Sequence, residues 1–299
     1  MTDTTSRDAT PFIDGLHFGE CPRWRDGRLW FVDFYDRTVQ SVGPSGDDLR
    51  VELEVPGEPA GLGWLPDGRL LVVARKPRTV LRLEPDGRLV HHGDLKPTAG
   101  FYGNDMVVDA TGRAYVGNFG FDLDGLIEER GYETLFDPPG PPTTALVRID
   151  PDGSAHVAAG DLSFPNGSVI TPDGGTLIVA ETLAGRLTAF DVGAGGELTG
   201  RRVWAELEWC APDGICLDAD GHVWVANAIT NQCWLVAEGG EILDRISTGL
   251  NSFACMLGGD DRRTLYIMSS PTSTESMVSA VRTAGIEQAR VAVPGAGLP

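Results

Sequence analysis

Short apolar runs separated by polar turns recur along the whole chain. Each repeat joins an apolar run to a second run rich in β-branched and aromatic residues, with turn-forming residues between them. Apolar and polar positions alternate within these runs, which is typical of strands, and Asp-Gly pairs supply the positive φ that tight hairpins need. Hairpins are therefore predicted at residues 21–34, 61–74, 105–118, 167–180, 214–227 and 254–268.

Further strands follow each hairpin. TVQSV at 38–42 is a clear third strand, and the Asp-Gly pair at 86–87 leads into a fourth. Four antiparallel strands repeated about every 40–60 residues are typical of a propeller blade, whereas helical solenoids show 3.6-residue apolar spacing. We therefore expect an all-β fold: a single six-bladed β-propeller over residues 1–299, with four-stranded antiparallel blades around a central channel. Residues near 12–18 are expected to close the ring by pairing near 289–293.

One segment interrupts the repeat. Residues 121–143 are polar, rich in proline and too long for a turn between strands. Long ordered loops on a rigid scaffold often carry binding functions, but others are passive surface loops. We expect this insertion to cover the mouth of the channel, and a passive loop is the alternative.

Equivalent positions of the repeat carry oxygen-bearing side chains. The first strand of each blade lines the channel of a propeller, so residues at one repeat position form a ring at one height. Counting back four residues from the apolar position of each inner strand gives Glu20, Ala60, Asn104, Asn166, Asp213 and Phe253. Four of the six offer oxygen donors. We call these four the ring residues.

Buried polar side chains that converge need a partner, because an unpaired carboxylate out of water is costly. Two carboxylates and two amides form an all-oxygen set that suits one hard divalent cation. Ca²⁺ is the first expectation, with Mg²⁺, Mn²⁺ and Zn²⁺ left open. The alternative is a structural ring of hydrogen bonds, and Asn166-Gly167 and Asp213-Gly214 taken alone are typical of turns.

The amino-acid composition argues against several classes of binding partner. The chain has 43 acidic against 24 basic residues, a net charge of −19, so no basic surface is expected to neutralise nucleic acid. The polar N-terminus does not resemble a signal peptide, and no apolar stretch reaches transmembrane length. Five cysteines without a C-x-x-C pair suit reduced thiols. We expect a cytoplasmic monomer with no membrane partner.

Four segments carry a family resemblance. GECPRW at 19–24, GND at 103–105, FPNG at 164–167 and APDGICLDADGHVWVAN at 211–227 resemble the gluconolactonase, senescence marker protein (regucalcin) and luciferin-regenerating enzyme family. The resemblance implies a six-bladed propeller with a divalent cation in its channel, and many members hydrolyse sugar lactones. It also implies that Glu20, Asn166 and Asp213 bind the metal and that Asn104 contacts substrate or metal.

The resemblance further implies that Asp213 is the catalytic general base, which helps to deprotonate the attacking water. Gluconolactone-cleaving members have an arginine where this chain has Tyr102, and an expected acidic residue is replaced near Phe121 and Asp122. We therefore expect Asn104, Tyr102, Phe119, Phe121 and Asp122 to bind substrate in a pocket that is less polar than a sugar site.

The leading functional hypothesis is a metal-dependent lactonase that acts on a small-molecule lactone or ester. A phosphotriesterase-like hydrolase could use the same calcium site. A non-catalytic propeller that binds calcium or another ligand is the third hypothesis, since a fold alone does not determine function.

Overall fold

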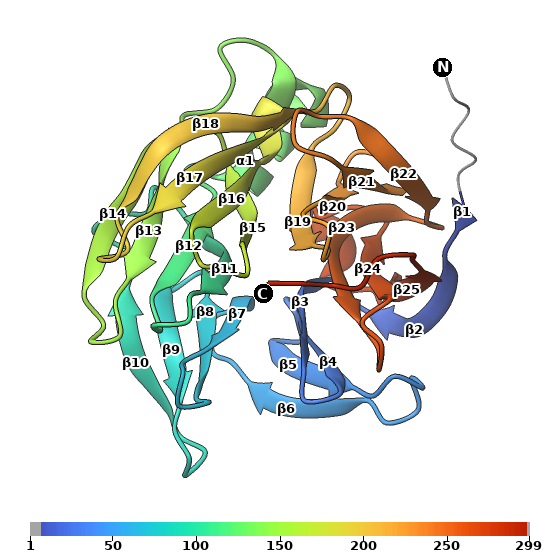
Figure 1. Cartoon of the computed structure of the whole chain (residues 1–299), viewed down its shortest axis with the longest axis horizontal. Helices are drawn as coiled ribbons and strands as arrows, with labels where there is room; N and C mark the ends of the chain where they lie inside the picture. The colour runs from blue at the N-terminus through green and yellow to red at the C-terminus, as the bar shows by residue number, and fades with distance from the viewer. Residues whose placement is uncertain (1–6, 298–299) are drawn as a thin grey trace.

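The computed structural model describes residues 7–297 and shows six β-sheets arranged as blades around a central axis (Figure 1). The predicted all-β, six-bladed propeller is confirmed, with mainly four-stranded antiparallel blades. The inner strands are β3 (Gly19–Arg25), β7 (Pro59–Trp64), β11 (Gly103–Val108), β15 (Pro165–Ile170), β19 (Pro212–Leu217) and β23 (Asn251–Gly258).

The remaining strands follow outward in chain order. Second strands are β4 (Arg28–Asp33), β8 (Leu70–Ala74), β12 (Ala114–Asn118), β16 (Thr176–Glu181), β20 (Val223–Asn227) and β24 (Thr264–Ser270). Third strands are β5 (Thr38–Val42), β9 (Thr79–Leu83), β13 (Thr144–Ile149), β17 (Arg186–Val192), β21 (Gln232–Val236) and β25 (Ala284–Arg290). Fourth strands of the first five blades are β6 (Arg50–Glu54), β10 (Leu89–Asp94), β14 (Ala155–Leu162), β18 (Leu198–Glu206) and β22 (Ile242–Ser247).

The Asp-Gly turns differ from one hairpin to the next. Between β3 and β4, Asp26 and Gly27 both have positive φ (51° and 75°), as a two-residue turn requires. In the pair Asp67-Gly68 only the glycine has positive φ, 86°, and the turn is longer, since Leu65 N donates to Arg69 O. The pattern therefore located the hairpins, while the turn type varies between blades.

The N-terminal region closes the ring. Strand β2 (Thr10–Leu16) pairs antiparallel with β25 and supplies the fourth strand of the last blade, and β1 (Arg7–Asp8) runs parallel to β22. The expected closing segment near 12–18 is thus close to β2, but its partner lies at 284–290 rather than 289–293. Phe12 packs on Tyr266 with ring centroids 5.0 Å apart, which helps to hold β2 in place.

The insertion at 121–143 contains helical structure. Helix α1 (Leu123–Arg130) is followed by the 3-10 helix η1 (Tyr132–Phe136). Asp122 is the N-cap of α1, and its Oδ1 accepts a hydrogen bond from Gly125 N at 3.0 Å. Two short helices lie elsewhere, η2 (Thr182–Ala184) after β16 and α2 (Glu275–Val278) between β24 and β25.

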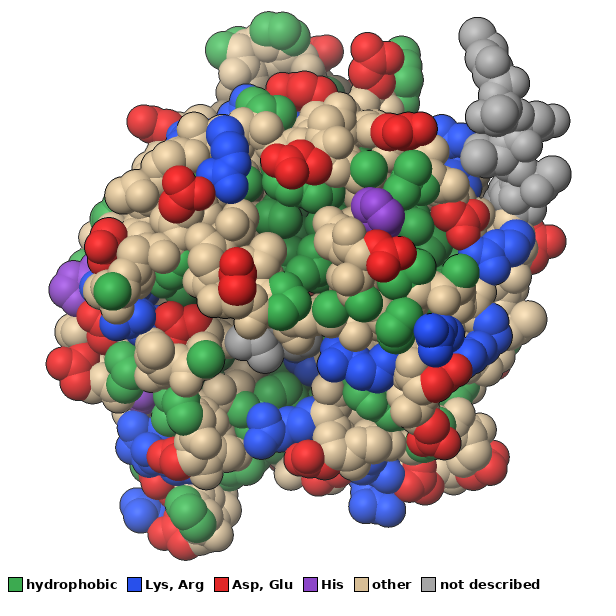
Figure 2. All heavy atoms as spheres, viewed as in Figure 1, with side chains coloured by type: hydrophobic (Ala, Val, Ile, Leu, Met, Phe, Trp, Pro, Cys, Tyr) green, Lys and Arg blue, Asp and Glu red, His purple; other side chains and the backbone are tan. Residues whose placement is uncertain are grey.

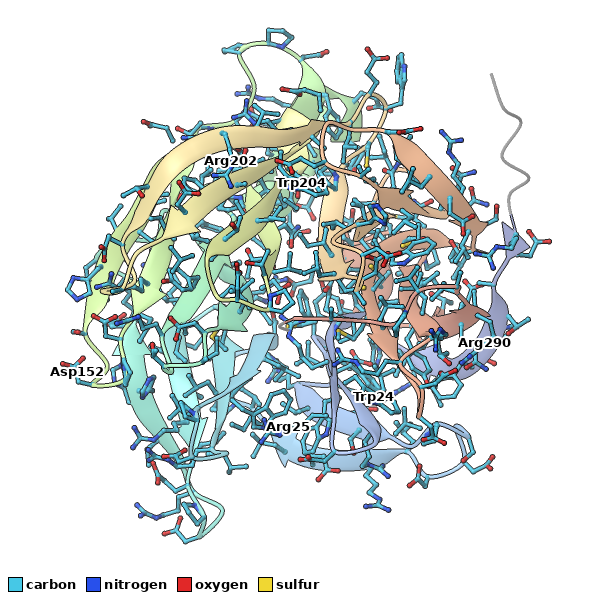
Figure 3. The ribbon with its side chains drawn as sticks, viewed as in Figure 1. Trp24, Arg25, Asp152, Arg202, Trp204 and Arg290 are labelled. Carbon is cyan, nitrogen blue, oxygen red and sulfur yellow. The ribbon has the colours of Figure 1, made fainter. Side chains whose placement is uncertain are left out.

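Figures 1 to 3 view the face at which the inner strands end. The C-terminal segment crosses the channel here, held by the bond from Ala296 N to Leu217 O at 2.9 Å. Figure 3 shows Trp24 and Arg25, the last residues of β3, at the inner part of the first blade. Acidic side chains are spread over this face with arginines between them (Figure 2). Within residues 7–297 no helix is long and apolar enough to span a bilayer.

The apolar core lies within and between the blades. Side chains such as Phe31, Leu62 and Trp224 are almost completely buried, and all five cysteines are buried and unpaired. Leu16 of the closing strand is 2% exposed and belongs to the cluster that joins the last blade to its neighbours.

The closing strand gives a stability prediction. Leu16→Ala should lower the free energy of unfolding by about 2–5 kcal/mol, because it leaves a cavity under β2. The exposed Thr10→Ala on the same strand should change it by no more than about 0.5 kcal/mol. Equilibrium urea denaturation followed by tryptophan fluorescence measures both. A Leu16→Ala loss as small as that of Thr10→Ala would show that closure by β2 contributes little.

Candidate functional site

The ring residues lie together at one end of the channel. Each is the second residue of its inner strand: Glu20 of β3, Asn104 of β11, Asn166 of β15 and Asp213 of β19. All are buried, with exposed fractions of 5–8%, and all line one pocket. The structure therefore brings the predicted set together at the opposite end of the channel from the face in Figure 1. The other two ring positions, Ala60 and Phe253, are buried apolar residues.

A β-bulge accompanies each ring residue. The register between first and second strands shifts after Glu20, between Gly103 and Met106, between Pro165 and Ser168, and between Pro212 and Ile215. A bulge leaves residues unpaired, bends the strand and redirects its side chains. The bulges explain why polar residues at these positions turn into the channel rather than continue the pleated alternation.

The glycines that follow two ring residues lie within strands rather than at turns. A Cβ on Gly167 would lie 2.6 Å from Asp213 O, and a Cβ on Gly214 would lie 2.5 Å from the Ala254 Cβ. Both distances are shorter than a van der Waals contact, so only glycine allows neighbouring inner strands to approach this closely. The turn interpretation of these Asn-Gly and Asp-Gly pairs is wrong.

The two ring amides are oriented by hydrogen bonds. Asn104 Nδ2 donates to Asn166 Oδ1 at 2.9 Å, and Asn166 Nδ2 donates to Thr182 Oγ1 at 3.2 Å. The Thr182 hydroxyl in turn donates to Pro212 O at 2.8 Å, next to Asp213. Asn104 Oδ1 accepts neither of these bonds and Asn166 Oδ1 keeps a second lone pair, so both carbonyl oxygens can contact a ligand.

The surroundings of the two ring carboxylates disfavour their charged forms. Burial raises the pKa of Glu20 from 4.5 to about 8, and the negative charge of Asp105 adds to the increase. Burial also raises the pKa of Asp213, and the charge of Glu20 acts in the same direction. The nearby Arg23 guanidinium is 2.7 Å from Asp105, which largely compensates its charge. The ring thus holds two acids without a basic partner of their own.

This donor set fits a hard divalent cation. Two carboxylates and two amide carbonyls supply oxygen ligands, and a cation would offset the burial and the negative charges that raise both pKa values. Within residues 7–297 no group of three or more His, Cys, Asp or Glu side chains is placed to hold a metal ion. The amides of Asn104 and Asn166 are therefore essential to the proposed site, and the role of all four as ligands stays a prediction.

Aromatic side chains form the walls of the pocket. Phe18, Phe34, Phe119 and Phe164 line it together with Leu123 of α1. Phe119 and Phe164 pack with ring centroids 4.9 Å apart. Leu123 and Asp124 belong to the insertion, so this segment contributes to the pocket wall.

The other predicted substrate residues lie farther from the ring. Tyr102 is half-buried and packs beside Phe119, with ring centroids 6.5 Å apart. Phe121 packs against Phe164 at 5.9 Å but lines a separate cavity in the insertion, and the exposed Asp122 caps α1. Phe119 lines the pocket itself. Substrate contact by Tyr102, Phe121 and Asp122 stays a prediction.

The sequence held a signal for part of the wall. In three of the four blades that carry a ring residue, the residue two positions earlier is aromatic: Phe18, Tyr102 and Phe164. Counting back two more positions in the repeat therefore marks aromatic side chains. Phe34, Arg75 and Phe119 share another repeat position, the first residue after the second strand of each blade. The remaining lining residues, Leu123, Asp124 and Ser273, come from connections that do not repeat. No periodic pattern identifies these.

Comparisons place the chain among known proteins. A family model for the SMP-30/gluconolactonase/LRE-like region matches residues 18–271. The 6-deoxy-6-sulfogluconolactonase of Pseudomonas putida is 26% identical over 291 residues, which are 94% of this chain and 94% of the relative.

Solved structures show the same fold. A luciferin-regenerating enzyme superposes with a TM-score of 0.77 at 20% identity, over 95% of both chains. Regucalcin of Agrobacterium tumefaciens, described as a calcium-binding protein, gives 0.74 at 19% identity over 97% of this chain and 98% of its own. Both superpositions cover nearly the whole chain, so the complete propeller has the fold of these solved structures.

The raised pKa values predict how pH affects stability. Between about pH 4.5 and 8 the folded, cation-free protein keeps a proton on Glu20 that the unfolded chain has lost. The free energy of unfolding should therefore fall as pH rises, by up to about 1.4 kcal/mol per pH unit for one such group. Asp213 acts in the same direction. Calcium should bind the ionised ring better, so it should raise the melting temperature more at pH 8 than at pH 5.

Differential scanning fluorimetry of EDTA-treated protein, with and without CaCl₂, measures this dependence. Glu20→Gln removes one titrating group and should flatten the pH slope and weaken the calcium effect. An identical slope and an identical calcium shift in wild type and Glu20→Gln would contradict the assignment.

Proposed function

The chain belongs to the SMP-30/gluconolactonase/LRE-like family, and on this premise we propose that it is a metal-dependent hydrolase that opens a lactone. The supporting observation is the buried oxygen ring at the base of an aromatic pocket. The name of the Pseudomonas putida relative specifies a lactonase, and that of the Agrobacterium tumefaciens structure specifies calcium binding. Ca²⁺ is therefore the proposed cofactor.

The pocket residues would bind the cation and the substrate, and one of them would also transfer a proton. Glu20, Asn104, Asn166 and Asp213 would hold the cation through oxygen. When bound there, a divalent cation supplies a positive charge that polarises the lactone carbonyl and acidifies a nearby water. The aromatic wall excludes bulk water and binds the apolar part of the substrate.

Asp213 is the proposed general base. It is buried in the pocket as part of the ring that would hold the cation, so its carboxylate would lie beside a water activated there. Asp213 would accept the proton of the attacking water as the new carbon–oxygen bond forms. The bond between the carbonyl carbon and the endocyclic oxygen of the lactone then breaks. That oxygen takes up a proton and becomes the hydroxyl group of the product.

A kinetic comparison tests this proposal. A panel of lactones assayed by pH-stat should show hydrolysis with Ca²⁺ that is lost with chelator. Asp213→Asn should lower kcat at least about 100-fold, the usual contribution of a general base. The exposed Asp220→Asn in the same blade is the matched control and should retain wild-type activity.

Calcium titration of Asp213→Asn separates loss of metal from loss of the base. Organophosphate triesters assayed in parallel test the phosphotriesterase alternative. Lactone hydrolysis that survives both chelation and Asp213→Asn would contradict the mechanism. Calcium binding without turnover of any ester would favour the non-catalytic alternative.

A further inference from the structure

A buried arginine forms the second polar feature of the pocket. Arg75 follows β8 directly, is 2% exposed and lines the same pocket as the ring residues. Its backbone is fixed by two hydrogen bonds, from Arg75 N to Glu58 O at 2.8 Å and from Gly103 N to Arg75 O at 3.1 Å. Gly103 precedes Asn104, so the position of Arg75 is coupled to the ring.

Aromatic rings surround the guanidinium. Its central carbon lies 5.1 Å from the ring centroid of Phe34, 5.3 Å from that of Tyr102 and 5.4 Å from that of Phe119. These cation–π contacts hold the side chain in place and remove most of its water. The charge is therefore fixed in a largely apolar wall.

The guanidinium retains unused donors. Arg75 Nε lies 3.3 Å from Glu58 and Nη2 lies 3.6 Å from Glu275, yet neither nitrogen makes a hydrogen bond within residues 7–297. Nη1 likewise makes no hydrogen bond within residues 7–297, and Arg75 lines the pocket. Buried donors without acceptors are costly, and a ligand oxygen would remove that cost.

The neighbouring Lys76 contacts one oxygen of each of the two carboxylates. Its Nζ lies 2.6 Å from Glu58 and 2.8 Å from Glu275, closer than Arg75 lies to either. A purely structural role for Arg75 would predict the shorter contacts on Arg75. Lys76 and Arg75 together balance the charge of the two glutamates, so the feature that Arg75 offers to a ligand is its unused hydrogen-bond donors.

We propose that Arg75 is a specificity-determining residue that binds an oxygen substituent of the substrate, preferentially a carboxylate. The inference rests on the proposed lactonase function and deepens it. Phe34, Phe119 and the ring of Tyr102 supply an apolar surface for the body of the molecule, and Arg75 supplies one anchor for an acceptor oxygen. The substrate class is a lactone with a mainly apolar ring and one acidic group.

Three γ-butyrolactones that differ only in the γ-substituent test this inference: carboxylate, hydroxymethyl and methyl. Wild type should favour the carboxylate, with the hydroxymethyl compound intermediate. Arg75→Gln should raise KM for the carboxylate compound about 10- to 100-fold, the effect of losing a charge-assisted hydrogen bond. It should change kcat/KM for the methyl compound less than about threefold.

Lys76→Met is the matched control, because it breaks ion pairs with the same two glutamates from the neighbouring position. It should lower the preference for the carboxylate less than Arg75→Gln does, and Arg75→Lys should restore part of that preference. An equal loss of preference in Lys76→Met, or no preference in wild type, would overturn the inference. Both outcomes leave the lactonase proposal intact if the methyl compound is opened.

A binding measurement keeps the test independent of turnover and of variant folding. The ring-opened product of the carboxylate compound is 2-hydroxyglutarate, and calorimetric titration should show tighter binding to wild type than to Arg75→Gln or Arg75→Lys. Equal binding to all three proteins would overturn the role of Arg75. Failure of all three lactones to open, with binding still dependent on Arg75, would contradict the lactonase function alone.

Discussion

The close approach of the inner strands determines the chemistry of this molecule. At the level of the ring, the neighbouring strands leave no room for a Cβ at Gly167 or Gly214. Bulges at the same level turn the polar side chains inward, where they lose water. Burial raises the pKa of both carboxylates, and the charge of Glu20 raises that of Asp213 further, so a bound cation would relieve the cost of ionising them.

The repeat made the fold and the ring predictable. Each blade begins with the same strand in the same orientation, so counting along the sequence was equivalent to measuring height in the channel. That logic found Glu20 and Asp213 although 193 residues separate them. The same count places Phe18 and Phe164 at one height, two residues before their ring positions, but an apolar side chain in a repeat does not distinguish a pocket wall from the core.

Much of the rest of the pocket could not be read from the sequence, because it depends on connections that differ between blades. Arg75 has the same repeat position as Phe34 and Phe119, but no pattern shows that its Nη2 lies 3.6 Å from Glu275 of α2, in the last blade. Lys76 reaches the same glutamate across 199 residues of sequence. No spacing rule links such residues, and the helix in the insertion that brings Leu123 and Asp124 to the wall is equally specific to this chain.

The charges of the pocket are separated into two poles. Arg23 and Asp105 form an ion pair below the ring, so that layer adds little net charge to either pole. The ring remains acidic, whereas Arg75 lines the pocket beside Phe34 and Phe119 and shares two glutamates with Lys76. Low-polarity walls between the poles prevent water from screening them. A molecule that fits must therefore present its reactive carbonyl to one pole and a separate oxygen to the other, with an apolar body between them.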